Sequence, residues 1–268
     1  MRLNDDCNKL KDIRPTDKTM FTPEERARLR SRLLDLAGTD DRITGAAVTG
    51  SAADSREDEW SDVDLAFGVG AAADLATVLS DWTAHMYDHH HALHHLDVMS
   101  GPWTYRVFLL ANTLQVDLAF VIETEFRALA PTFRLIFGKA NEPRHPSPPQ
   151  AGPIVGMAWL YALHARSCIA RRKLWQAEYM ISGIRDNALA LACLRHNLST
   201  AHGRGIDLLP VGVAAQFEES LVRQLSAAEL SRSFKAVVCG LLHEIRSTDA
   251  ELEVRLRSAL TQLAKTPA

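Results

Sequence analysis

Three aspartates of this sequence lie in or beside apolar stretches. Asp62 and Asp64 stand at the start of the apolar run 63–69, and Asp117 stands in the later run 114–122. Side chains alternate along a β-strand, so Asp62 and Asp64 would point to the same face. Burying unpaired carboxylates is costly, which makes a purely structural role hard to justify. Mg²⁺ prefers carboxylate oxygens together with substrate phosphates, so the pattern favours a metal site.

A turn of small residues, Gly50-Ser51, precedes these aspartates. Glycine lets the backbone approach a phosphate closely, and Ser51 adds a hydroxyl donor beside free backbone N–H groups. Bound metal would reverse the local charge, so that the carboxylates would no longer repel a triphosphate. We therefore predict a site for metal and triphosphate, with Asp117 as a shared metal ligand or as the general base.

Helices and strands are needed to position this site. The residues from Thr22 to Glu25 read as a capped helix start, and we predict a helix to about Ala37 that ends at Gly38. Alternation and apolar content predict strands over 43–49 and 63–69, flanking the Gly-Ser turn. The remaining predicted elements are a helix over 72–86 and strands over 95–99, 104–110 and 114–122.

A proline-rich segment divides the chain. Five prolines fall within residues 141–153, a density that disfavours a continuous helix or a central strand. Beyond it the apolar residues recur with helical spacing. We predict a catalytic domain over 1–140, a linker over 141–153 and a helical, acceptor-binding domain over 154–268. The expected fold class is α+β, with a mixed twisted sheet and flanking helices followed by an α-helical bundle.

The composition limits the partners and the location of the protein. A formal charge of −3 over 268 residues gives no support for a protein that coats nucleic acid, and we expect no stable nucleic-acid partner. The four cysteines are scattered and form no CxxC pair, and no signal peptide is visible. No apolar run is long enough to span a membrane. These features predict a cytoplasmic protein; they leave its oligomeric state open.

The second half of the chain offers charged residues that could join the site. Glu178 and Arg185 are seven residues apart, about two helical turns, and so share a face of one helix. A functional interpretation places Lys173 and Arg185 at the triphosphate and Glu178 at the acceptor. The alternative is a solvated basic cluster with a charge pattern internal to the helix.

The motifs together resemble a known superfamily. Gly50-Ser51, then Asp62-Val63-Asp64, then Asp117 on a later strand is similar to the DNA polymerase beta-like nucleotidyltransferases. The length, the two-domain layout and the segment 170–191 are similar to the antibiotic nucleotidyltransferases of the aminoglycoside and lincosamide type. The resemblance implies that the Gly-Ser turn holds a nucleoside triphosphate and that the three aspartates bind two divalent metal ions, most simply Mg²⁺.

The resemblance also implies an activity, with alternatives. The protein would be an enzyme, an antibiotic-resistance nucleotidyltransferase that transfers a nucleoside monophosphate, AMP from ATP, to a hydroxyl group with release of pyrophosphate. The acceptor would be a small molecule such as an aminoglycoside or lincosamide antibiotic. One alternative is a protein-modifying nucleotidyltransferase of a toxin–antitoxin pair. Another is a catalytically silent nucleotide-binding module with the same fold.

Three further patterns have both functional and structural interpretations. The acids at 54 and 57–59 could form an acidic rim for a cationic acceptor, or they could simply be solvated. The histidines at 89–91, 94 and 95 could bind zinc, although a solvated segment is the simpler interpretation because no cysteine accompanies them. Arg195 and His202 have the spacing of a signature that is typical of helical ribonucleases.

Overall fold

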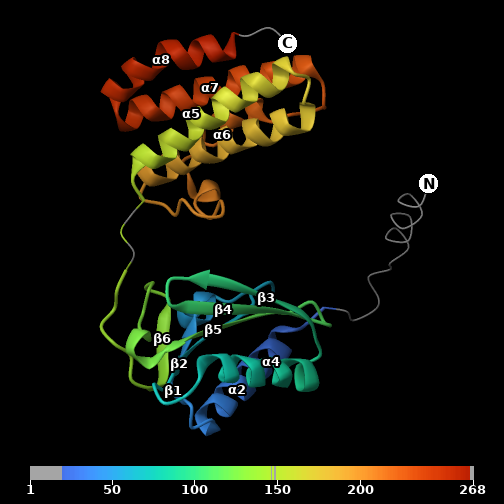
Figure 1. The fold of residues 1–268 in the computed structure, drawn as a ribbon, viewed down its shortest axis with the longest axis vertical. Helices are drawn as coiled ribbons and strands as arrows, with labels where there is room; N and C mark the ends of the chain where they lie inside the picture. The colour runs from blue at the N-terminus through green and yellow to red at the C-terminus, as the bar shows by residue number, and fades with distance from the viewer. Residues whose placement is uncertain (1–19, 146, 148, 266–268) are drawn as a thin grey trace, which may run out of the picture. The chain divides into compact units, whose positions relative to one another are not determined.

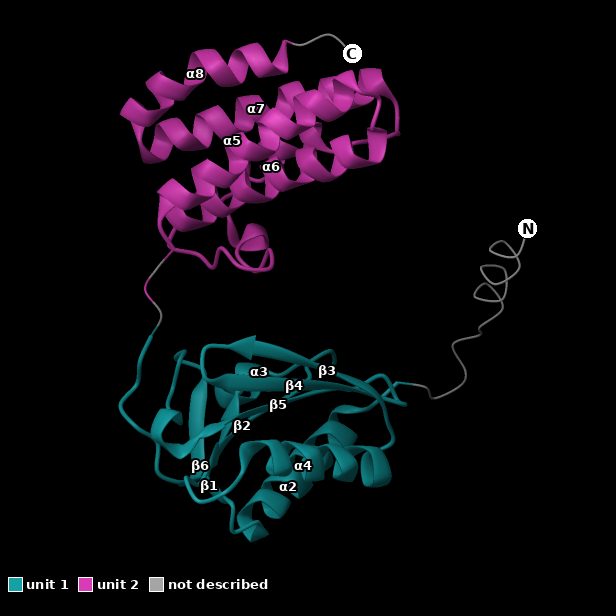
Figure 2. Ribbon diagram, viewed as in Figure 1, with its two compact units in different colours: residues 1–146 teal, residues 147–268 magenta. Residues whose placement is uncertain are grey.

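The computed structural model describes residues 20–145, 147 and 149–265. The chain forms two compact units, Met1–Pro146 and Ser147–Ala268, coloured separately in Figure 2. Their division falls inside the proline-rich segment. Residues 1–19, at the N-terminus, lie outside the described part of the chain.

The first unit is built on a six-stranded sheet with the strand order β3-β4-β5-β2-β1-β6. Strands β2 and β5 are parallel to each other, and every other neighbouring pair is antiparallel. The predicted mixed sheet is therefore confirmed. The strands are β1 (Ile43–Thr49), β2 (Val63–Val69), β3 (Ala92–Ser100), β4 (Trp103–Leu110), β5 (Gln115–Ile122) and β6 (Phe133–Gly138).

Two helices cover one face of this sheet, α2 (Pro23–Thr39) and α4 (Leu75–His90), which lie on the same side of it in Figure 1. Between these helices and the sheet lies the main core of the unit. Aromatic rings pack at its centre, where Phe67 contacts both Trp82 and Phe120. Because the helices use this face, the opposite face is left for polar residues and for a shorter covering segment.

The two helices begin and end for identifiable reasons. The side chain of Thr22 accepts a hydrogen bond from the backbone N–H of Glu25, and Glu25 accepts one from the backbone of Thr22. This is the predicted capping box. Gly38 does not end α2, which continues to Thr39. The other helix, α4, starts later and ends later than predicted, so its last turn includes part of the histidine-rich segment.

Strand β6, which pairs with β1 at the edge of the sheet, was not predicted from the sequence. Its residues are mostly exposed and lack clean alternation, so no periodic pattern marks it. The segment before β6 crosses the open face of the sheet and inserts the ring of Phe126. Paired glycines make room for that ring, because a Cβ at Gly45 or Gly68 would lie within 3 Å of it.

The second unit is the predicted helical bundle, which the structure confirms. Its first helix begins inside the predicted linker, two residues before Pro153, because the first turn of a helix tolerates proline. No helix among the described residues is long and apolar enough to cross a membrane. The helices are α5 (Ala151–Ala170), α6 (Leu174–Arg195), α7 (Ala227–Thr248) and α8 (Ala250–Ala264), with short 3₁₀ turns η3 (Ile206–Leu208) and η4 (Ala215–Ser220).

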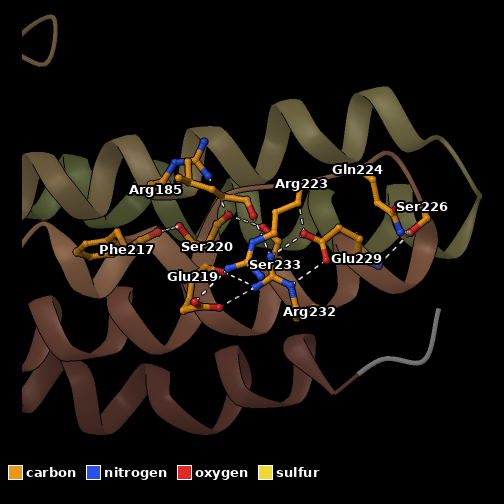
Figure 3. Close-up of polar contacts among 11 residues, drawn as sticks. Arg185, Phe217, Glu219, Ser220, Arg223, Gln224, Ser226, Glu229, Arg232 and Ser233 are labelled. Atoms are coloured by element: carbon orange, nitrogen blue, oxygen red, sulfur yellow. Dashed lines mark hydrogen bonds and ion pairs between the residues drawn. The ribbon is translucent and has the colours of Figure 1, made fainter.

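Polar contacts fasten η4 to the helices of the bundle (Figure 3). The carbonyl oxygen of the buried Ser220 accepts hydrogen bonds from Arg185 of α6 and from Ser233 of α7. Arg232 of α7 donates to the carbonyl oxygens of Glu219 and Leu221. Side chains thus satisfy backbone groups that the end of the short turn leaves without helical partners.

Candidate active site

The three aspartates share the open face of the sheet. Along β2 and β5, the apolar residues Val63, Leu65, Val116 and Leu118 belong to the core under α2 and α4. The alternate residues therefore point to the opposite face. The parallel register pairs Asp64 directly with Asp117, and Asp62 immediately precedes the paired Val63. Residues 53 positions apart in the sequence are brought side by side in this way.

The carboxylate groups of Asp62, Asp64 and Asp117 lie close enough to hold one cation. One oxygen from each lies within 4.8 Å of the others, and all three residues are half-buried. This is the one group of three or more potential metal-ligating residues found in the described part of the chain. A set of hard carboxylate oxygens suits Mg²⁺ or Mn²⁺ better than a softer metal.

The electrostatics of Asp117 reflect this crowding. Burial raises its pKa to about 6, and the negative charge of Asp62 contributes to the rise. A hydrogen bond from the amide of Gln115 acts in the opposite direction. A bound cation would favour the charged form of Asp117, because it would offset the repulsion from Asp62 and the cost of burial.

Gln115 is a site residue that sequence reasoning missed. Its Nε2 donates to Asp117 Oδ1 at 3.0 Å and to Asp62 Oδ2 at 3.2 Å, so one amide group bridges two of the three carboxylates. Gln115 stands two positions before Asp117 on β5, a spacing that places it on the same face. That spacing was the available signal, but a single glutamine beside a carboxylate is too common to be singled out.

Gly50 has a local reason to be glycine that the sequence did not reveal. Its φ is +63°, in the left-handed region, and a Cβ built on it would lie 2.0 Å from Asp64 Oδ2. Any side chain there would displace the carboxylate. Ser51 follows within the short helix α3 (Gly50–Ala53) and is half-buried. The expected contacts of Gly50 and Ser51 with a triphosphate remain predictions.

The loop that leads to Asp62 is anchored from beneath by α2. The buried Arg26 donates to the carbonyl oxygens of Asp58 at 2.6 Å and Ser61 at 2.9 Å. Glu57 forms ion pairs with Arg26 and with Arg30. Helix α2 thereby fixes the start of β2 and, with it, the position of Asp62.

A small cavity of about 120 Å³ opens on the same face next to the carboxylates. Its floor contains Ala66 and Ala119, each two residues beyond an aspartate of the site on β2 or β5. Alanine at both positions leaves the space open. Aromatic and other side chains form the walls, namely Thr49, Trp103, Tyr105, Arg127, Leu129, Ala130, Thr132 and Phe133.

The predicted site residues of the helical unit have contacts of their own. Lys173 is exposed at the N-cap of α6 and its side chain caps no helical N–H. Arg185 donates to the carbonyl oxygen of Ser220 and to Ser182 Oγ, and Ser182 donates to Glu178 (Figure 3 shows Arg185). The roles of Lys173, Arg185 and Glu178 at a nucleotide or an acceptor remain predictions.

Arg195 has a structural partner. Its guanidinium group forms hydrogen bonds with both oxygens of Glu244, which is fully buried on α7. Gln216 also donates to Glu244. His202 is exposed in the connector after α6. The ribonuclease-type spacing singled out Arg195, and its guanidinium group is therefore engaged in an ion pair within the bundle.

The chain is similar to the crystal structure of an aminoglycoside 6-adenyltransferase from Bacillus subtilis, with a TM-score of 0.41 and 12% sequence identity. The similarity covers 92% of this chain and 100% of that one. No family model and no curated protein matches the chain.

Proposed function

We propose that the protein is a metal-dependent nucleotidyltransferase that transfers AMP from ATP to a hydroxyl group of a small molecule. The observation that carries this proposal is the convergence of Asp62, Asp64 and Asp117 on the open face of the sheet. The charge at this point has the sign and the ligand type that Mg²⁺ with a triphosphate requires. A bound divalent cation would neutralise charge on the phosphates.

The residues of the chain have separate roles in this proposal. Asp62 and Asp64 hold the metal, and Asp117 shares it or accepts the proton of the acceptor hydroxyl. Gly50 and Ser51 receive the phosphates through backbone N–H groups and the serine hydroxyl. Positioning and charge neutralisation supply most of the rate, as in other phosphoryl-type transfers.

The remaining assignments are extensions of the same proposal. The small cavity with the alanine floor includes Thr49, next to Gly50, and we assign it to the nucleoside. We assign Lys173 of the helical unit to the triphosphate, because its exposed ammonium group is available for an anion. Arg185 and Glu178 are retained as predicted contacts with the nucleotide and the acceptor, although the contacts they make within the bundle offer a structural reason for their presence.

The test is ATP binding and transfer with Mg²⁺, comparing the wild type with Asp64→Asn. We expect the variant to lose about 10³-fold in transfer rate, equivalent to about 4 kcal/mol of transition-state stabilisation. Asp54→Asn is the matched control, because Asp54 is exposed, pairs with Arg56 and is not a member of the triad. ATP binding that is independent of Mg²⁺ and without turnover would instead indicate a silent nucleotide-binding module.

Transfer of label to a purified protein, with small molecules left unmodified, would favour a protein-modifying enzyme of the toxin–antitoxin type. An Asp64→Asn variant with full activity would show that the metal assignment is wrong. Both outcomes are read from the same assay with labelled ATP, separated by gel for protein and by chromatography for small molecules.

A further inference from the structure

The order of the strands gives the acceptor a direction of approach, provided that the proposed function is correct. Gly50 and Ser51 follow β1, which lies on the side of β2 away from β5. Phosphates held there place the leaving pyrophosphate over the β1 side of the triad. The attacking and leaving oxygens of such a transfer lie roughly in line. The acceptor hydroxyl therefore comes from the opposite side, over β5 and the strands beyond it, β4 and β3.

The surface on that side includes an apolar shelf, beside which lie His94 and His95. Val107 of β4 stands directly opposite Asp117, and Leu96 of β3 stands opposite Val107. In the next row, Leu109 stands opposite Gln115. Leu96 and Leu109 are about half exposed, at 54% and 48%. The shelf, defined as Leu96, Val107 and Leu109, is thus continuous with the carboxylate site through cross-strand neighbours on one face.

The shelf forms part of a groove of about 390 Å³ that also includes Gln115, which bridges Asp62 and Asp117. This volume falls within the range of small-molecule sites. Neighbouring strands are about 4.8 Å apart, so Leu96 lies about 10 Å from Asp117 across the sheet. That length fits a molecule of two linked rings with its hydroxyl group at Asp117.

A polycationic acceptor would find little opposite charge here. Asp97 lies on the neighbouring β3, but both of its oxygens accept from Arg106. In the acidic loop before β2, Glu57 pairs with Arg26 and Arg30. The groove itself contains no carboxylate among the described residues that line it.

Two other acids of that loop are also engaged. Asp54 pairs with Arg56, and Asp58 accepts hydrogen bonds from Ser61 and from the backbone of Trp60. The acidic rim that the sequence offered for a cationic acceptor is therefore largely used to shape the loop.

We propose that the acceptor is a neutral, largely apolar alcohol or phenol that lies on the Leu96–Val107–Leu109 shelf. In the reaction, the acceptor oxygen forms a bond to the α-phosphorus of ATP. The bond from that phosphorus to the pyrophosphate oxygen breaks, pyrophosphate leaves, and Asp117 takes the hydroxyl proton. The products are the adenylylated acceptor and pyrophosphate.

The experiment compares two probes, 4-phenylphenol and the polycation tobramycin, with the full-length protein, ATP and Mg²⁺. Binding is measured by calorimetry in the presence of a non-hydrolysable ATP analogue, and transfer by pyrophosphate release. We expect 4-phenylphenol to bind and to be adenylylated in preference to tobramycin. Leu109→Asp should weaken binding of 4-phenylphenol at least tenfold, and Leu109→Ala a few-fold, while Mg²⁺-dependent binding of the nucleotide is kept.

Leu135→Asp is the matched control, because Leu135 is similarly exposed, at 41%, but lies on the opposite edge strand β6. Preference for tobramycin, or binding of neither probe by a protein that binds the nucleotide with Mg²⁺, overturns the inference and leaves the proposed function standing. Failure to bind the nucleotide with Mg²⁺ overturns the proposed function itself. Equal loss of binding in Leu109→Asp and Leu135→Asp would show that the shelf is not the acceptor site.

Discussion

Two half-buried or buried carboxylate environments in this protein differ in how their charge is balanced. In the helical unit, Glu244 is fully buried, but Arg195 and Gln216 satisfy its oxygens. On the sheet of the first unit, Asp117 faces Asp62 across a few ångströms, and the neutral amide of Gln115 bridges them. In the first arrangement a cation of the same unit balances the charge, whereas in the second the charges of Asp62 and Asp117 repel each other and a bound cation would offset that repulsion.

The comparison shows that the balance of charge around a carboxylate can distinguish a structural role from a ligand-binding role. A buried charge with a partner from the same unit holds the fold together, and removing that partner is costly. A cluster of like charges lowers stability in the absence of a ligand. Such clusters are therefore typical of functional sites. Removing a charged group at the two places should therefore change stability in opposite directions.

Arg195→Ala should give the largest effect. It leaves the carboxylate of Glu244 buried and without its cation, so we expect a loss of about 3–5 kcal/mol in the free energy of unfolding of the helical unit. Urea denaturation followed by circular dichroism measures this. Arg223→Ala is the control, since its pair with Glu219 is exposed. Nearly equal stabilities of the two variants would contradict the comparison.

Gly50→Ala should give the next largest effect. It forces a non-glycine residue into a positive φ and drives a methyl group against Asp64 Oδ2. We expect a loss of about 2 kcal/mol in stability, together with weaker binding of Mn²⁺ as a spectroscopic substitute for Mg²⁺. Gly38→Ala in α2 is a matched control, because no atom lies within 4 Å of its added Cβ, and it should be neutral or stabilising. Unchanged Mn²⁺ affinity in Gly50→Ala would show that Asp64 is not a ligand.

Asp117→Asn should stabilise the metal-free protein. The folded-state pKa of Asp117 is raised to about 6, above its value in an unfolded chain, so the charged form is disfavoured by folding. Stability of the metal-free wild type should therefore be greatest on the acid side of the transition and fall as pH rises through 6. At pH 7 the variant should be more stable by about 1 kcal/mol, with allowance for partial exposure. Melting curves in EDTA from pH 5 to 8 test this, and a variant less stable than the wild type at pH 7 would contradict it.

Gln115→Met should give the smallest effect. The substitution removes the amide that lowers the pKa of Asp117, so the pH-dependent loss of stability should move to higher pH. The expected change in stability at pH 7 is within about 1 kcal/mol, the range of a single hydrogen bond. The same melting curves in EDTA measure it. A midpoint that stays at the wild-type pH would mean that the amide does not act on Asp117.

The elements of the first unit were predicted unequally well. Strands β1 and β2 lie within the bounds expected from the sequence, because their alternating or continuous apolar residues end abruptly at turn residues. Helix α2 was predicted from its capping box. Strand β6 was not found, because an exposed edge strand needs few apolar residues. Its place is set by pairing with β1, which no local pattern encodes.

The sequence by itself determined the kinds of residue at the candidate site: two aspartates two apart on a strand, a third on a later strand, and a Gly-Ser turn before them. Alternation along a strand is a local property, so the face shared by Asp62 and Asp64 could be predicted. Tertiary structure decided that Asp117 lies beside Asp64, through the parallel register of β2 and β5. It also decided that Gly50 must lack a side chain and that Gln115 bridges two carboxylates. These facts depend on contacts between residues far apart in the chain. Such contacts form only when the strands pair, so no local sequence pattern encodes them.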